Sequence, residues 1–319
     1  MSASENGGAK SLRDVLSRFG QKLNERAEKA ERSRPGTVAE ALDRATERLS
    51  AAGVDAPRRS AELLAEKAFG LSRLGLIVRK KDELSLEQQA AFDALVSRRE
   101  KGEPVAYLLG EKEFYGLELA VTPATLIPRP DTETMVEEAL KRFPADSPLV
   151  FADFGTGTGA LAIALAHVFP LSRGTAVDIS PEALDVARAN AERHGVAERI
   201  DFIEGDMLQP LLPPVSCDLI VSNPPYVTEG EYAELSREVR EFEPRLALVS
   251  PADGLEHLRG LLPHAVSALK SGGLLLCEIG AGQGGGALEA ARAHSPELAD
   301  CAILKDLAGL DRVLLARRA

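Results

Sequence analysis

Short apolar runs alternate with helix-period segments along the second half of the chain. Each run is bounded by Gly, Pro or Asp, as a buried strand would be. The segments between the runs carry apolar residues every three or four positions, which predicts amphipathic helices. Strands that alternate with helices form a parallel sheet with right-handed crossovers, so an α/β fold is expected. The expected parallel strands are 149–154, 175–177, 200–203, 217–221 and 274–279, and an antiparallel pair at 302–304 and 313–315 closes one edge.

The first third of the chain has only the helical period, so we expect it to form a separate small bundle. Thr37 with Glu40, and Ser85 with Gln88, have the spacing of capping boxes, which satisfy free backbone N–H groups at a helix start. This part contains no constellation of catalytic residue types, which favours a lid or a domain that docks a substrate. The predicted domains are an amphipathic N-terminal extension at 1–36, a helical substrate-docking domain at 37–102, a β-connector at 103–130 and the main α/β domain at 131–319.

Composition limits the class of protein. Hydrophobic residues make up 45% and charged residues 27% of the chain, which is typical of a soluble globular protein. No apolar run reaches the ~18 residues of a membrane helix, and the polar N-terminus lacks the apolar core of a secretory signal. Cys217, Cys277 and Cys301 fit no disulfide or metal spacing, so we expect a cytoplasmic protein without a metal. The net charge of −11 argues against nucleic acid as a direct partner. We also expect a monomer with no membrane partner.

A glycine-rich turn follows the first expected strand. Gly155, Gly157 and Gly159 allow the backbone to pass close to a ligand, and they aim free N–H groups of the next helix at it. With Ala160, and with Asp178 about twenty residues further on, the turn also satisfies the dinucleotide-binding pattern. A nicotinamide-dependent enzyme is therefore a hypothesis that the turn alone leaves open.

Three features argue against a nicotinamide-dependent enzyme. Thr156 and Thr158 stand between the glycines, a pattern that suits an amino acid and a ribose at least as well as a pyrophosphate. Asp206 follows the third strand, where its carboxylate can accept a hydrogen bond from an adenine amine, and Asp178 offers two acceptor oxygens to ribose hydroxyls. The fourth strand leads into Asn223–Tyr226, an Asn-Pro-Pro-Tyr motif that hydride transfer does not need.

The Asn-Pro-Pro-Tyr motif predicts a stiff corner at the end of a strand. Neither Pro224 nor Pro225 has an N–H to donate, so the strand cannot continue its ladder. One amide side chain and one aromatic ring are thereby held at the carboxyl edge of the sheet, where open α/β sheets bind ligands.

Together these motifs resemble the S-adenosylmethionine-dependent amino-group methyltransferases, through Phe151–Gly159, Asp178 and Asn223–Tyr226. Several further segments are similar to the bacterial release-factor glutamine N5-methyltransferases of the HemK type. These segments are Leu126–Glu133, Glu243–Leu248, Asp253–Leu255, Glu278–Gly280 and Asp306–Arg312. The resemblance covers about residues 37–319. The combination is specific, whereas the Asn-Pro-Pro-Tyr motif by itself is shared with DNA adenine and RNA guanine methyltransferases.

The resemblance implies a Rossmann-like methyltransferase domain preceded by a small helical-bundle domain. It also implies the activity: transfer of a methyl group from S-adenosyl-L-methionine to N5 of the glutamine in the Gly-Gly-Gln motif of peptide-chain release factors, in translation termination. Tyr115, Arg129 and Glu133 become candidate contacts to the protein substrate. Two other functions stay open, a nucleic-acid base amino-group methyltransferase and a non-catalytic adapter that binds S-adenosylmethionine.

The chemistry of a carboxamide explains why such a motif suits glutamine. The amide nitrogen is a poor nucleophile, and its two N–H groups need acceptors in a dry pocket. We expect the side-chain oxygen of Asn223 and the carbonyl of Pro224 to accept them, with Tyr226 flat against the amide, so that the nitrogen is aligned for attack. The predicted catalytic residues are Asn223, Pro224 and Tyr226, and Pro225 joins them in substrate binding. The predicted cofactor-binding residues are Gly155, Thr156, Gly157, Thr158, Gly159, Asp178, Asp206, Met207 and Asn223.

Overall fold

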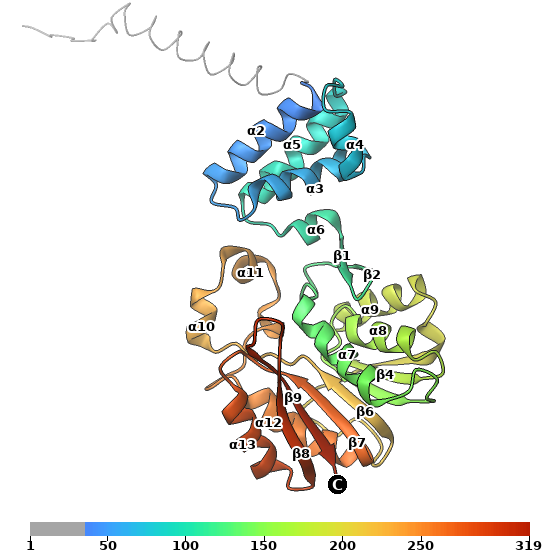
Figure 1. The fold of residues 1–319 in the computed structure, drawn as a ribbon. Coiled ribbons are helices and arrows are strands. Elements are labelled where there is room, and N and C mark those ends of the chain that lie inside the picture. Colours follow the sequence, from blue (N-terminus) through green and yellow to red (C-terminus); the bar gives the residue numbers. More distant parts are fainter. Residues whose placement is uncertain (1–35) are drawn as a thin grey trace, which may run out of the picture. The chain divides into compact units, whose positions relative to one another are not determined.

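The computed structural model describes residues 36–319. The chain divides into two compact units, one ending at Lys101 and the other running from Gly102 to Ala319 (Figure 1). The amphipathic helix predicted within residues 1–36 lies outside the described residues. Each unit is described by itself below.

The first unit is a bundle of α2 (Val38–Ala51), α3 (Pro57–Phe69), α4 (Arg73–Val78) and α5 (Leu86–Glu100). Both predicted capping boxes are confirmed, since Thr37 and Ser85 each exchange hydrogen bonds with the third helical residue. Apolar faces at helical spacing meet in the bundle, where the rings of Phe69 and Phe92 pack with their centroids 5.0 Å apart.

The second unit opens with α6 (Val105–Leu109) and a hairpin of β1 (Glu111–Phe114) and β2 (Leu117–Ala120). The alternating pattern predicts β2; β1 is an addition that the structure reveals. The turn between them uses Tyr115 at φ 51° and Gly116 at φ 75°. A short 3-10 helix, η1 (Pro130–Thr132), then leads into α7 (Glu133–Arg142). The apolar side chains of the hairpin belong to the same core as those of α7, so residues 103–130 pack as part of this unit.

A seven-stranded sheet organises the second unit, in the order β5-β4-β3-β6-β7-β9-β8. All predicted strands are present, and the first five are parallel, as expected. The terminal hairpin adds two antiparallel strands at one edge. The strands are β3 (Val150–Phe154), β4 (Arg173–Asp178), β5 (Ile200–Glu204), β6 (Cys217–Ser222), β7 (Leu269–Glu278), β8 (Leu298–Lys305) and β9 (Asp311–Arg318).

Helices cover both faces of this sheet (Figure 1). Side chains alternate between the faces with period two, as on any strand. Phe151, Leu219 and Val221 enter the core that contains α7 and α8 (Ala160–Val168), whereas Ala152 and Ile220 enter the opposite core. The remaining helices of the unit are α9 (Pro181–Arg193), α10 (Glu229–Glu234), α11 (Arg237–Phe242), α12 (Glu256–Ala268) and α13 (Gly284–His294), with the 3-10 turns η2 (Ala197–Arg199) and η3 (Arg245–Ala247).

Parallel pairing positions the functional edge. Because β3 to β7 run in the same direction, their carboxyl ends meet at one side of the sheet. The residues that follow or end these strands are therefore brought together although they are far apart in sequence. Within residues 36–319, no helix is long and apolar enough to cross a membrane.

Close packing between β3 and β4 generates a first prediction. Gly174 lies directly opposite Phe151 in the ladder, and a Cβ at position 174 would come 2.2 Å from Cζ of that fully buried ring. We expect Gly174→Ala to lower the free energy of unfolding by about 1–3 kcal/mol, because the core is overpacked. The matched control is Gly285→Ala on α13, where a Cβ meets nothing within 4 Å. Urea unfolding of both variants checks this, and an unchanged midpoint for Gly174→Ala would contradict it.

Candidate active site

A cavity of about 470 Å³ lies at the carboxyl edge of the sheet. Its walls come from the ends of β3, β4, β5 and β6, from residues 124–132 and from the segment 244–247. The predicted site residues that line it are Gly155, Thr156, Gly157, Thr158, Asp178, Asp206, Met207, Asn223 and Pro225. Gly159, Pro224 and Tyr226 are outside that lining.

The glycine turn has the backbone that the sequence predicts. Gly155, Gly157 and Gly159 have φ values of 73°, 55° and 80°, which residues with a Cβ atom rarely adopt. A Cβ on Gly155 would come 3.0 Å from the terminal methyl of Met207, so the glycine leaves room for that thioether beside the cavity. Gly159 instead permits helix packing, since a Cβ there would meet Ile163 at 2.9 Å and Ala187 at 3.2 Å.

Asp178 ends β4 beside this turn. One carboxylate oxygen accepts from the backbone N–H of Gly157 at 2.8 Å, and the other accepts from that of Ser180 at 3.0 Å. Each oxygen keeps a further lone pair, so a pair of vicinal hydroxyls can still bind. Burial raises the pKa of Asp178, and the backbone N–H groups act in the opposite direction.

Asp153 is a site residue that the sequence analysis did not single out. It lies on β3, it is 1% exposed, and it lines the cavity. Its Oδ2 accepts from the hydroxyl of Thr156 at 2.6 Å and from the N–H of Ala162 at 3.2 Å, whereas its Oδ1 is buried without a partner in the structure. Burial raises the pKa of this carboxyl to about 7. A buried acceptor without a donor is costly, so a cationic or N–H group of a ligand would stabilise it.

The charges of the lining select the kind of ligand. Asp153, Asp178, Glu182 and Asp206 contribute carboxyl groups, against the one guanidinium of Arg129. Such a wall attracts a sulfonium and an ammonium group and repels a pyrophosphate. The dinucleotide reading of the glycine turn is therefore disfavoured.

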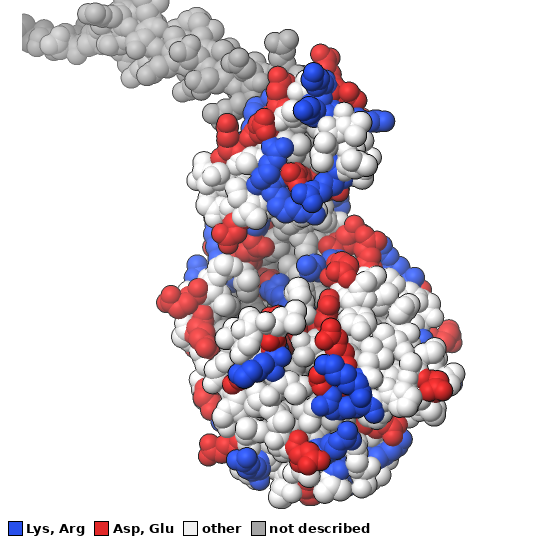
Figure 2. Space-filling view, viewed as in Figure 1, with Lys and Arg blue, Asp and Glu red and all other residues white. Residues whose placement is uncertain are grey.

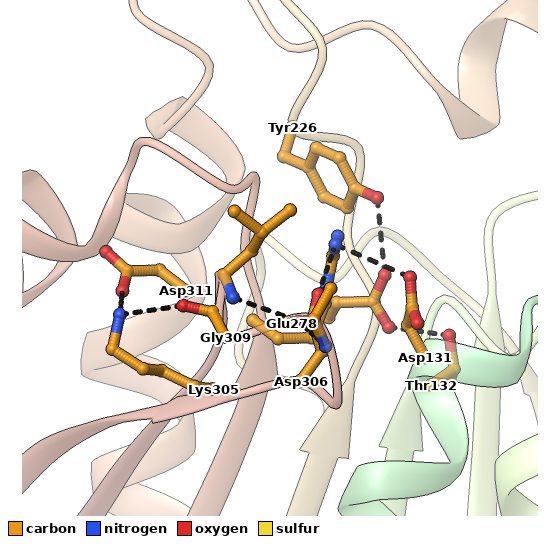
Figure 3. Close-up of polar contacts among 11 residues, drawn as sticks. Asp131, Thr132, Tyr226, Glu278, Lys305, Asp306, Gly309 and Asp311 are labelled. Atoms are coloured by element: carbon orange, nitrogen blue, oxygen red, sulfur yellow. Dashed lines mark hydrogen bonds and ion pairs between the residues drawn. The ribbon is translucent and has the colours of Figure 1, made fainter.

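Asn223 follows β6 and belongs to a chain of hydrogen bonds that begins on the η1 segment. Its Nδ2 donates to Oγ1 of Thr132 at 3.2 Å, and that hydroxyl donates to Oε2 of Glu278 at 2.6 Å. The hydroxyl of Tyr226 donates to Oε1 of the same glutamate at 3.3 Å. Figure 3 shows Thr132 and Tyr226 converging on Glu278 from different segments.

Glu278 ends β7 and is almost fully buried. Burial raises its pKa, while the hydrogen bond from Thr132, the positive charge of Arg312 and the hydrogen bond from Tyr226 lower it. Arg312 is held by a hydrogen bond of 2.9 Å to Asp306 and by an ion pair of 3.4 Å to Asp131. Thr132 directly precedes α7, but its side chain makes no capping hydrogen bond to that helix. The threonine hydroxyl is bound by Glu278 instead.

The three candidate substrate contacts lie in different places. Arg129 lines the cavity and forms an ion pair of 2.5 Å with Glu243, whose other oxygen accepts from the N–H of Ile127 at 3.1 Å. Glu133 accepts a hydrogen bond of 2.9 Å from the N–H of Tyr115, and neither residue is part of the cavity lining. Their roles toward a substrate stay predictions.

Charges of both signs are mixed on the visible surface of the second unit. Figure 2 shows Lys and Arg side chains interspersed with Asp and Glu on the face of residues 102–319 that is in view. That face has no continuous basic strip of the kind that tracks a nucleic-acid backbone.

Comparison with known proteins defines the class and then the family. A family model described as a methyltransferase domain matches residues 151–242, and one described as the PrmC N-terminal domain matches residues 40–110. The chain is an S-adenosylmethionine-dependent methyltransferase with a Rossmann-like domain.

Similar sequences identify the family. The release factor glutamine methyltransferase of Nitratidesulfovibrio vulgaris is 45% identical over 277 residues, covering 87% of this chain and 94% of the relative. That of Moorella thermoacetica is 44% identical over 282 residues, covering 88% and 99%. The chain belongs to the release factor glutamine methyltransferase family. Among solved structures, ribosomal protein L11 methylase from Lactobacillus delbrueckii subsp. bulgaricus is 24% identical with a TM-score of 0.44, covering 62% of this chain and 83% of that one.

The buried carboxyl of Asp153 predicts a specific pH dependence. Because its folded pKa of about 7 lies above the ordinary value of 3.8, the native state holds an extra proton between these values. The unfolding free energy of the wild type should therefore fall, relative to Asp153→Asn, by about 1 kcal/mol per pH unit from about pH 4 to 7, and level off above. Chemical denaturation across this range measures it, with the exposed Asp185→Asn as control. Parallel curves for wild type and Asp153→Asn would exclude the assignment.

Proposed function

We propose that this chain transfers a methyl group from S-adenosylmethionine to N5 of the glutamine in the Gly-Gly-Gln motif of peptide-chain release factors. The observation that carries the proposal is the position of Asn223. This side-chain amide lines the same cavity as the glycine turn and Asp178, and its NH₂ group is bound by Thr132. Its oxygen is therefore left for a donor that enters the cavity.

The residues of the cavity fit the cofactor. The unpaired Oδ1 of Asp153 is an acceptor for the ammonium group, and Asp178 can accept both ribose hydroxyls. Asp206 can accept from the adenine amine, although its Oδ1 already accepts from the N–H of Leu208 at 2.9 Å. Met207, beside Gly155, offers a polarisable surface to the purine ring. When bound, S-adenosylmethionine supplies a methyl group that its sulfonium already activates.

The chain's own contribution to transfer is positioning. Oδ1 of Asn223 and the carbonyl of Pro224 would accept the two N–H groups of the substrate amide, and the ring of Tyr226 would flank its plane. Two fixed acceptors and a flat surface hold the nitrogen in a near-attack arrangement, which is worth several kcal/mol of the barrier. No general base is required before transfer, because the amide nitrogen can lose its proton after the N–C bond has formed and the S–C bond of the donor has broken.

The proposal extends to partners and location. The predicted helical domain, residues 37–102, would dock the release factor. Arg129 of the connector is a candidate substrate contact in the cavity of the second unit. A monomer in the cytoplasm is part of the same proposal. The three free cysteines, Cys217, Cys277 and Cys301, are consistent with the reducing conditions of that compartment and do not bear on the oligomeric state.

Cofactor binding gives the first test. Asp178→Ala should weaken binding of S-adenosylmethionine by about 10–100-fold, because hydrogen bonds to a charged group contribute roughly 1.5–3 kcal/mol. Calorimetry measures it, with Asp185→Ala on α9, whose side chain is exposed, as the matched control. Binding of NADH together with no binding of S-adenosylmethionine would reverse the assignment.

Methyl transfer gives the second test. Asn223→Ala should keep its affinity for S-adenosylmethionine and lose about 10²–10³-fold in kcat, on the order of one oxyanion-hole donor. The assay uses labelled S-adenosylmethionine and a release factor, and mass analysis locates the methyl group. A release factor with asparagine at the acceptor position is the substrate control. Transfer at the wild-type rate would remove Asn223 from the mechanism, and label on co-purified nucleic acid would point to a base methyltransferase.

A further inference from the structure

The hydroxyl of Thr132 is the centre of the hydrogen-bond chain at the acceptor side of the cavity. It donates to Oε2 of Glu278 at 2.6 Å and accepts from Nδ2 of Asn223 at 3.2 Å. Thr132 is 5% exposed. It lies at the end of the proline-flanked segment, residues 126–132, in which Pro128 and Pro130 stand on either side of Arg129 before α7 begins. Three segments separated by 91 and 146 positions in sequence meet at this one oxygen.

A hydroxyl has a single proton, and this fact fixes the direction of the chain. Because Thr132 donates its proton to the carboxylate, its oxygen can act only as an acceptor toward a neighbouring amide. Asn223 must then present its NH₂ group to Thr132 and turn its oxygen elsewhere. The reverse rotamer would set two acceptors against each other at hydrogen-bond distance.

The carboxylate that imposes this direction is itself held from several sides. The hydroxyl of Tyr226 donates to Oε1 of Glu278, and the charge of Arg312 acts on the same carboxylate. With Thr132 donating to the other oxygen, both oxygens have a donor, as Figure 3 shows. A buried charge with partners at both oxygens has a fixed orientation.

We propose that Thr132 and Glu278 are positioning residues that hold the Asn223 oxygen toward the acceptor group and so make the site selective for a carboxamide over a carboxylate. This inference rests on the proposed function. A glutamine presents N–H donors to that oxygen, whereas a glutamate of the same shape presents only lone pairs. The side chain that discriminates is Asn223, and the carboxylate of Glu278 sets its orientation through the threonine.

The test compares the methylation kinetics of Thr132→Val and Thr132→Ser. The matched control is Thr175→Val, at a position on β4 outside the cavity lining. Thr132→Val should lower kcat by about 10–100-fold, the effect of one unsatisfied polar group, and change S-adenosylmethionine affinity by less than about threefold. Thr132→Ser restores the hydroxyl and should recover most of the rate. In Glu278→Gln the new amide can donate to Thr132, which would reverse the direction of the hydrogen bonds and turn the Asn223 oxygen toward Thr132. The kcat of this variant should therefore fall as it does in Thr132→Val.

Two readouts separate positioning from a general structural defect. Adding Thr132→Val to Asn223→Ala should cost nothing more, because the group to be positioned is gone. Release factors with glutamate or glutamine at the acceptor position are compared as competitive inhibitors of methylation. With the wild-type enzyme, the glutamate form should inhibit at least about tenfold more weakly than the glutamine form. With Thr132→Val, the two forms should inhibit nearly equally. Additive losses in the double variant, or unchanged selectivity in Thr132→Val and Glu278→Gln, would overturn the proposal.

A measurement without turnover keeps this inference distinct from the proposed function. In protein labelled with ¹⁵N-asparagine, the side-chain amide signal that disappears in Asn223→Ala should shift in Thr132→Val and stay in place in Thr175→Val. An unmoved signal would refute the contact. A shifted signal in a protein that does not methylate release factors would support the orientation while the proposed substrate fails.

Discussion

Parallel pairing at the carboxyl edge of the sheet is the constraint on which the rest of the structure depends. β3, β4, β6 and β7 each carry a polar residue at or next to their last position, namely Asp153, Asp178, Asn223 and Glu278. A parallel register brings these strand ends within reach of one another. Backbone N–H groups from the glycine turn and from the start of α8 satisfy part of their hydrogen-bonding capacity. The same geometry that completes the ladder thus concentrates acceptors beside a cavity.

Much of this arrangement could be predicted because it depends on residues that are close together in sequence. Period-two and helical patterns predict the strands and most helices, and the glycine turn and the Asn-Pro-Pro-Tyr corner depend on residues adjacent in sequence. Helix α13 was missed, since it opens with three glycines that are poor helix formers. Packing explains two of these glycines: a Cβ at Gly284 would come 2.4 Å from Asp311, and one at Gly286 would come 2.7 Å from Leu255. Tertiary contact here outweighs local preference.

Three residues of the site could not be predicted, because their roles depend on contacts that form only in the folded chain. Thr132 has the sequence context of a helix cap, yet its hydroxyl is bound by a glutamate 146 positions away. Asp153 is one residue of an apolar strand, and nothing in its neighbourhood shows that one of its oxygens would be buried without a donor. Glu278 stands at the end of the apolar run Leu274–Cys277, where an acid is unexpected unless partners from elsewhere compensate its burial.

Two buried glutamates also explain how the cavity wall formed by residues 124–132 keeps its shape. Glu243 binds the start of the proline-flanked segment through the N–H of Ile127 and the guanidinium of Arg129, and Glu278 binds its end through Thr132. Pro128 and Pro130 restrict the backbone between these anchors, so few conformations are lost when the segment is ordered. A segment that is stiff by sequence and attached at both ends can hold the Thr132 hydroxyl in place against Asn223. The position of Asn223 at the cavity therefore depends on a rigid segment that comes before the first strand of the seven-stranded sheet in the chain.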